Sequence, residues 1–186
     1  MLELNDVLLE GEKSTLSLMA REGELTCLTT PGAPLHSTPL RWLYAMLGLE
    51  HVKGGFISID GEPLTSSSAQ VMRRQMAFVP AALEDVGQVT VYEAPTPHDV
   101  FGLKANGGCQ EERLQQEMAL TGATGQKAQL LAVASLLGRR ILLVDRPLAS
   151  SLPFLRSKAD SGCTVIIASN DNTVVSRADN VVEIDD

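Results

Sequence analysis

The sequence is poor in aromatic residues and in long apolar runs, and its basic residues form no cluster. Aromatic residues make up 4% of the 186 residues, and no apolar stretch is as long as a membrane-spanning helix. The formal net charge is −8, which argues against a nucleic-acid partner. The opening segment MLELNDVLLEGE has no basic region before a long apolar run. We therefore expect no signal peptide and a cytoplasmic protein.

Cysteine and histidine are also scarce, and they are scattered along the chain. The residues concerned are Cys27, Cys109, Cys163, His36, His51 and His98. No CxxC pair occurs, so no metal site is predicted from their spacing. Cys27 and Cys163 lie in or beside apolar runs, where a reduced, buried thiol is the expected state. The sequence also lacks GxSxG and HExxH, so neither a serine hydrolase nor a zinc protease is indicated.

Extended apolar segments towards both ends of the chain predict a central sheet. They are LELNDVLL (2–9), ELTCLTT (24–30), GGFISIDGEPL (54–64), QMAFVP (75–80), ILLVD (141–145), TVIIAS (164–169) and NVVEID (180–185). In LELNDVLL, apolar and polar residues alternate for a few positions, which suits an antiparallel edge strand. The segments ILLVD and TVIIAS are continuous aliphatic runs, typical of strands buried on both faces of a parallel sheet.

Helical patterns lie between these strands. In the clearest, STPLRWLYAMLG (37–48), Thr38 can cap the helix, Pro39 suits its first position and Gly48 suits the position after its end. The others are QEERLQQEMALTG (110–122) and the mostly apolar GQKAQLLAVASLLGRR (125–140). Residues 82–109 hold no period and are predicted to be rich in loops. Helices that alternate with buried strands predict an α/β domain.

Five fragments follow one another in a recognisable order. They are GELTCLTTPGAPLHSTPLRWLYAMLGL (23–49), GGFISIDGEPL (54–64), RRQMAFVP (73–80), ATGQKAQLLAVASLLGRRILLVDRP (123–147) and TVIIASNDNTVVSRADNVVEIDD (164–186). This series resembles the ATP-binding subunit of an ABC transporter over nearly the whole chain. The resemblance implies a P-loop NTPase-like α/β fold in three layers, with a mostly parallel core sheet and antiparallel edge strands. It also implies a single domain over residues 1–186, with a reduced helical or loop subdomain at 82–122.

The phosphate-binding loop of that family, GxxxxGK(S/T), corresponds to residues 30–37, but the residues differ. Thr30 stands at the first glycine, Leu35 at the second and His36 at the lysine, while Ser37 is retained. The family's loop needs converging backbone N–H groups, a lysine for the outer phosphates and a hydroxyl on Mg²⁺. A neutral His36 is a poor replacement for that lysine. The candidates left for phosphate contact are His36, Ser37 and Thr38.

The start of the following helix also departs from the family. Because Thr38 precedes Pro39, helical geometry at Thr38 is disfavoured. We expect the helix to begin near Pro39, about one turn late, so that its positive end lies away from the phosphate position. Pro34 has no N–H to offer.

Most of the remaining motif positions also hold residues other than those that the family uses. Asp145 matches the acidic residue that supports Mg²⁺, but Arg146 stands where the family has its general-base glutamate. Ala81 replaces a metal-coordinating glutamine, and Asn170 stands at the switch histidine. The segment 122–126 is similar to the family's signature sequence. Of that signature it keeps Gly125 and Gln126.

A purely structural role is the alternative for each of these positions. Asp145 can pair with Arg146 or cap a turn, and Ser37 can belong to a helix cap. Gly125 and Gln126 can form a helix entrance, and His36 can be a solvated loop residue.

The leading hypothesis is an ABC ATP-binding-subunit-like protein that has no catalytic residue, needs no cofactor and acts through protein association or regulation. It predicts a homodimer or a heterodimer with another ABC-type subunit, and a position at the inner face of the membrane through a permease partner. One alternative is an ATP-binding subunit that energises a transporter through weak or atypical ATP binding, with Ser37 and Asp145 holding Mg²⁺. The other is a small-anion site at residues 30–37.

Overall fold

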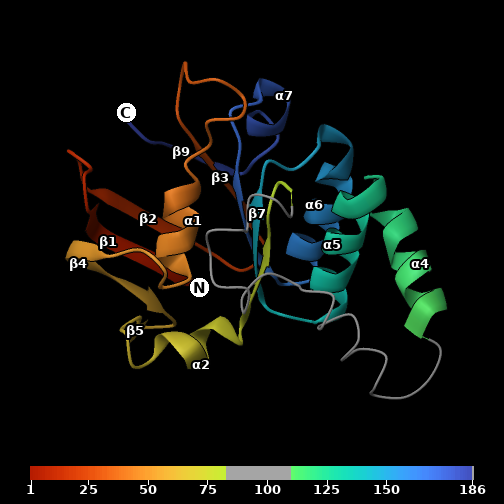
Figure 1. The fold of residues 1–186 in the computed structure, drawn as a ribbon, viewed down its shortest axis with the longest axis horizontal. Coiled ribbons are helices and arrows are strands. Elements are labelled where there is room, and N and C mark those ends of the chain that lie inside the picture. The colour runs from red at the N-terminus through yellow and green to blue at the C-terminus, as the bar shows by residue number, and fades with distance from the viewer. Residues whose placement is uncertain (83–109, 186) are drawn as a thin grey trace.

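The computed structural model describes residues 1–82 and 110–185, and these residues form two sheets with helices around them (Figure 1). The strands are β1 (Leu2–Leu9), β2 (Leu16–Ala20), β3 (Leu25–Thr29), β4 (Val52–Ile59), β5 (Glu62–Pro63), β6 (Met76–Val79), β7 (Ile141–Asp145), β8 (Thr164–Ala168) and β9 (Asn180–Glu183). The helices are α1 (Leu40–Met46), α2 (Ala69–Arg73), α4 (Gln110–Leu120), α5 (Gly125–Leu136), α6 (Leu152–Asp160) and α7 (Asn172–Val175), with a 3₁₀ turn η2 (Ala149–Ser151). Within the described residues, no helix has the length and apolarity needed to cross a membrane.

The larger sheet is parallel and forms the centre of the molecule. Its strand order is β6-β7-β8-β3-β9, and every neighbouring pair is parallel. All residues of β3, β6, β7 and β8 are buried. For β7 and β8 the continuous aliphatic runs predict this burial. The predicted α/β fold with a mostly parallel core is therefore confirmed. The carboxyl ends of these strands share one edge, where the loops 30–39, 80–82, 146–148 and 169–171 follow them.

The antiparallel strands form a second sheet of their own, in the order β2-β1-β4-β5. The prediction that residues 2–9 form an edge strand is wrong, because β1 pairs with β2 on one side and with β4 on the other. β2 is not among the strands predicted from the sequence, although Leu16, Leu18 and Ala20 alternate there with exposed residues. Gly54 and Gly55 lie inside β4, next to an irregularity in its pairing with β1.

Two apolar cores lie on opposite faces of the parallel sheet (Figure 1). One face packs against α1 and the antiparallel sheet, with Leu28, Leu143 and Ile166 from the parallel strands. The other face packs against α5 and α6, with Cys27 and Val144 among its residues. The layers are therefore antiparallel sheet with α1, parallel sheet, and helices. Of the predicted subdomain at 82–122, residues 110–120 form α4, and residues 83–109 lie outside the described part of the chain.

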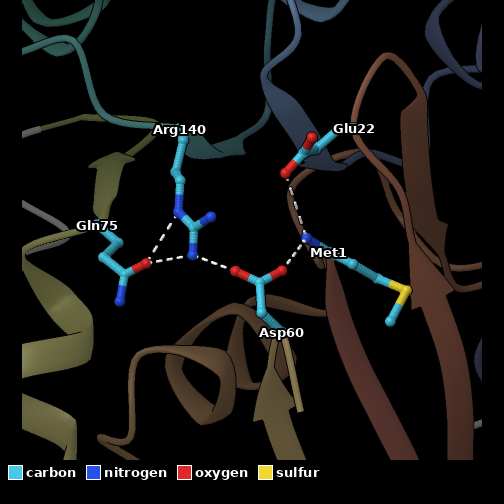
Figure 2. Close-up of polar contacts among 5 residues, drawn as sticks. All are labelled: Met1, Glu22, Asp60, Gln75 and Arg140. Atoms are coloured by element: carbon cyan, nitrogen blue, oxygen red, sulfur yellow. Dashed lines mark hydrogen bonds and ion pairs between the residues drawn. The ribbon is translucent and has the colours of Figure 1, made fainter. Parts of the chain in front are cut away.

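A chain of polar contacts links the two sheets (Figure 2). It lies opposite the loops that follow the carboxyl ends of the parallel strands. Asp60, just after β4, accepts a hydrogen bond from the Met1 amino group at 2.8 Å and is paired with Arg140, just before β7. The Arg140 Nε donates to Gln75 at 2.8 Å, and Glu22 lies 3.7 Å from the Met1 nitrogen. The hydrogen bonds from the Met1 amino group and from Arg140 lower the pKa of Asp60. Since these groups are well exposed, each pair contributes little to stability.

Candidate functional site

The loop that corresponds to the phosphate-binding loop joins β3 to α1 at the carboxyl edge of the parallel sheet. It contains two successive turns, in which the Ala33 N–H donates to the Thr30 carbonyl at 3.1 Å and the Ser37 N–H donates to the Pro34 carbonyl at 2.9 Å. Gly32 has a φ of 78°, a conformation that glycine adopts without strain. Residues 34–37 are exposed, and they include His36 and Ser37.

The side chain of Asn170 closes this loop on itself. Its Oδ1 accepts hydrogen bonds from the Thr30 N–H at 2.8 Å and the Thr29 hydroxyl at 3.1 Å. Its Nδ2 donates to the carbonyls of Pro34 at 3.1 Å and Ser37 at 2.9 Å. A primary amide offers two donors and one acceptor oxygen with two lone pairs, so the whole capacity of Asn170 is used within the loop. Asn170 therefore holds the start, middle and end of the loop together.

The helix after the loop begins late, as the Thr-Pro sequence predicts. The first helical residue of α1 is Leu40, and Pro39 occupies the N-cap position, where no side chain caps the helix. The prediction that Thr38 caps α1 is wrong, because its hydroxyl instead donates to Asp145 Oδ1 at 2.6 Å. The predicted placement of Pro39 as the first helical residue is off by one position, which is the usual uncertainty of a helix boundary. Because α1 starts at Leu40, its amino end lies beyond residues 30–37 of the loop.

Asp145, at the end of β7, is 1% exposed and has a partner on each carboxyl oxygen. Thr38 binds Oδ1, and the Arg146 Nε lies 3.3 Å from Oδ2. The structure therefore contains the Asp145–Arg146 pair, which was the alternative to a role of Asp145 in Mg²⁺ binding. Arg146 has a φ of 45°, and its N–H donates to the Ala168 carbonyl of the neighbouring strand at 2.9 Å. Asp145 and Arg146 are therefore both held in place at the carboxyl end of β7.

Sequence reasoning missed Lys127, which reaches this edge of the sheet from the first turn of α5. Its ammonium donates to the carbonyl oxygens of Pro80 at 2.7 Å and Asp145 at 2.6 Å. The side chain is partly buried, and the two carbonyls lie at the ends of the adjacent strands β6 and β7. The only signal in the sequence is one lysine near the start of a mostly apolar helix. That signal does not say which backbone groups the lysine meets.

The remaining predicted positions do not converge on this centre. Gly125 and Gln126 are exposed in the first turn of α5, which agrees with the helix-entrance alternative. Gly122, just before that helix, has a φ of 68°, and a Cβ at this position would overlap the carbonyl oxygen of Ser150. Thr38, and not Ser37, contacts Asp145. In the parts of the chain that the structure describes, no group of three or more His, Cys, Asp or Glu side chains could hold a metal ion.

Comparisons with known proteins agree with this architecture at the level of fold. No protein-family model matches the sequence, and no curated protein matches it.

The structure is similar to those of several ABC transporter components. It is similar to an ATP-binding subunit of an ABC transporter, at 18% identity and a TM-score of 0.69, covering 98% of this chain and 85% of the other. It is also similar to cbiO1 from Clostridium perfringens, part of the cbiONQ ABC transporter complex, at 17% identity and a TM-score of 0.68, covering 97% and 82%. A bacterial ABC transporter cassette with a dimeric structure matches at 16% identity and a TM-score of 0.64, covering 100% and 94%. At these identities the likeness concerns the fold, and this chain has the fold of the ATP-binding subunits of ABC transporters.

Proposed function

We propose that this protein is a noncatalytic relative of ABC ATP-binding subunits and acts by binding other protein subunits. The observation that carries the proposal is the Asn170 amide, which makes four hydrogen bonds to the end of β3 and to the loop after it. A nucleotide phosphate bound there needs donors directed towards it from this same loop. Here the Thr30 N–H is directed to Asn170, the Ala33 and Ser37 N–H groups close turns, and Pro34 has no N–H.

The groups around Asp145 support the same conclusion. A magnesium ion would need carboxylate or hydroxyl oxygens as ligands, but both Asp145 oxygens have partners within the chain. One of those partners, Arg146, is a cation next to the position where a second cation would bind. These residues therefore do not fit Mg-ATP, and the proposed function needs no nucleotide and no catalytic residue.

The proposed partners follow from the proteins with the same fold. The similar structures include a dimeric cassette and one part of the cbiONQ transporter complex. We infer that this chain pairs with a second cassette-type subunit, identical or different, or with a membrane permease. In the second case it lies at the inner face of the membrane. We also infer a regulatory role, because a noncatalytic subunit that binds the dimer interface of an active ATPase subunit changes the activity of that subunit.

Thermal unfolding with Mg-ATP, ADP and inorganic phosphate as separate ligands tests the proposal. At 100 times its Kd, a ligand of the native state stabilises it by about 2.7 kcal/mol, which raises the Tm of a chain of this size by roughly 5–11 °C. We expect no saturable shift with either nucleotide up to low-millimolar concentration, whereas an active ABC cassette assayed in parallel should shift. A saturable rise with Mg-ATP would overturn the proposal and favour weak or atypical ATP binding, which a hydrolysis assay would then examine. A rise with phosphate alone would favour the small-anion alternative.

The association itself is tested by sedimentation velocity with and without Mg-ATP. We expect any self-association to be independent of nucleotide. Dimerisation that requires nucleotide would contradict the proposal.

A further inference from the structure

A second region with possible ligand chemistry lies on the helical face of the parallel sheet, away from the loop at residues 30–38. It is a pocket of about 190 Å³ lined by Leu25, Leu152, Pro153, Arg156 and Arg177. These residues come from the start of β3, from the first two turns of α6 and from the segment after α7. None of them takes part in the contacts around Asn170 or Asp145.

The two arginines of the pocket differ in their partners. Arg156 is paired with Asp179 through both terminal nitrogens, at 2.7 and 3.0 Å, and Asp179 also accepts the Leu25 N–H at 2.7 Å. The hydrogen bonds from Arg156 lower the pKa of Asp179, so this pair stays ionised and mutually neutralised near pH 7. Asp160 is close enough to raise the pKa of Arg156, but it does not line the pocket. For the Arg177 guanidinium, the described residues provide no ion pair or hydrogen bond.

The rest of the lining is apolar and firmly packed. Leu25 and Leu152 are 1% and 4% exposed, and both belong to the core between the sheet and α6. An apolar cavity of about 150 Å³ is large enough to hold benzene. The pocket is partly open to solvent, and its volume leaves room for one ring or branched aliphatic group. The charge of Arg177 at its margin suits a carboxylate, which guanidinium binds through two parallel hydrogen bonds.

We propose that this pocket binds a small organic carboxylate, with its apolar group against Leu25, Leu152 and Pro153 and its carboxylate on Arg177. Because such a ligand has about ten non-hydrogen atoms and the pocket is open on one side, a Kd on the order of 1 mM is expected. The inference does not depend on the proposed function, since it uses different residues.

Benzoate and benzyl alcohol are the matched probes, because they share a ring and differ in charge. Each is titrated into ¹⁵N-labelled protein at constant ionic strength, and amide shifts are followed in two-dimensional NMR spectra. We expect benzoate to shift the amides of Leu25, Arg156 and Arg177 saturably. Benzyl alcohol should bind at least tenfold more weakly, since it lacks the charge-assisted hydrogen bonds.

Arg177→Ala tests the assigned residue, and Arg74→Ala removes an exposed arginine elsewhere as the control. Both side chains are on the surface, so both variants should fold. Benzoate affinity should fall roughly tenfold or more in Arg177→Ala and stay unchanged in Arg74→Ala. The proposal is overturned if benzoate leaves the pocket amides unshifted, if benzyl alcohol binds equally well, or if Arg177→Ala binds benzoate as the unmodified protein does.

Discussion

Replacing Asn170 by alanine should loosen the loop that this side chain closes. The substitution removes four hydrogen bonds and leaves the backbone of β8 and the loop otherwise unchanged. The contacts with the carbonyls of Pro34 and Ser37 are exposed, so water can replace them. The contacts with Thr29 and Thr30 are partly buried, and their loss accounts for most of the effect. At about 0.5–1.5 kcal/mol for each of these two bonds, the free energy of unfolding should fall by about 1–3 kcal/mol.

Urea unfolding measures this change, and hydrogen exchange followed by mass spectrometry localises it. The peptide that contains residues 30–38 should exchange faster in Asn170→Ala, while peptides from β7 and β8 should be affected only through global stability. Asn172→Ala is the matched control, because Asn172 is exposed at the start of α7 and its side chain makes no hydrogen bond to the residues that the structure describes. A stability loss below about 0.3 kcal/mol, with unchanged exchange in the loop, would refute the view that Asn170 holds it.

Other perturbations test the fold around the site. Gly122→Ala should destabilise the protein by several kcal/mol more than Gly138→Ala in urea unfolding; both positions have positive φ, but a Cβ at Gly138 meets open space. Because Arg156 lowers the folded-state pKa of Asp179, this carboxylate contributes stability above its unfolded pKa and loses it as the pH falls through the folded pKa. Urea unfolding from pH 7 to pH 3 should therefore show a smaller decline for Asp179→Asn than for the unmodified protein, and equal declines would contradict the assignment. Burial raises the pKa of the Cys27 thiol to about 12, so a thiol reagent at pH 8 should label Cys27 in urea but not in the native protein, as read by peptide mass spectrometry.

The parts of the fold that the sequence predicts are those set by local pattern. The runs ILLVD and TVIIAS identify β7 and β8 because a strand buried on both faces has no polar alternation. The late start of α1 follows from Pro39, since proline restricts the residue before it. The position of β1 inside its sheet was not predictable in this way, because pairing on two sides depends on β2 and β4. The alternation in β2 covers only five residues, too short a stretch for its period to stand out.

The site was less predictable, because its contacts join residues far apart in sequence. Residue pattern marks Asn170 as a departure from a histidine, but it cannot show that the amide meets a loop about 140 residues earlier. The pairing of Asp145 with Arg146 was foreseeable as an alternative, since the two are neighbours. The contact of Thr38 with Asp145 was not, because the same hydroxyl also suits a helix cap.

The contacts around Asp145 and Asn170 explain how the fold persists with such different loop residues. A buried carboxyl group or backbone N–H without a partner destabilises a protein by about 1–3 kcal/mol or more. Without side chains to meet them, Asp145 and the N–H of Thr30 would be such groups. Instead, Thr38 and Arg146 bind the carboxyl oxygens, and the Asn170 amide accepts from Thr30. Two of these three partners, Arg146 and Asn170, are residues that differ from the ABC pattern. The apolar runs can therefore keep the fold while the polar positions change, which is why likeness of fold alone does not carry the activity with it.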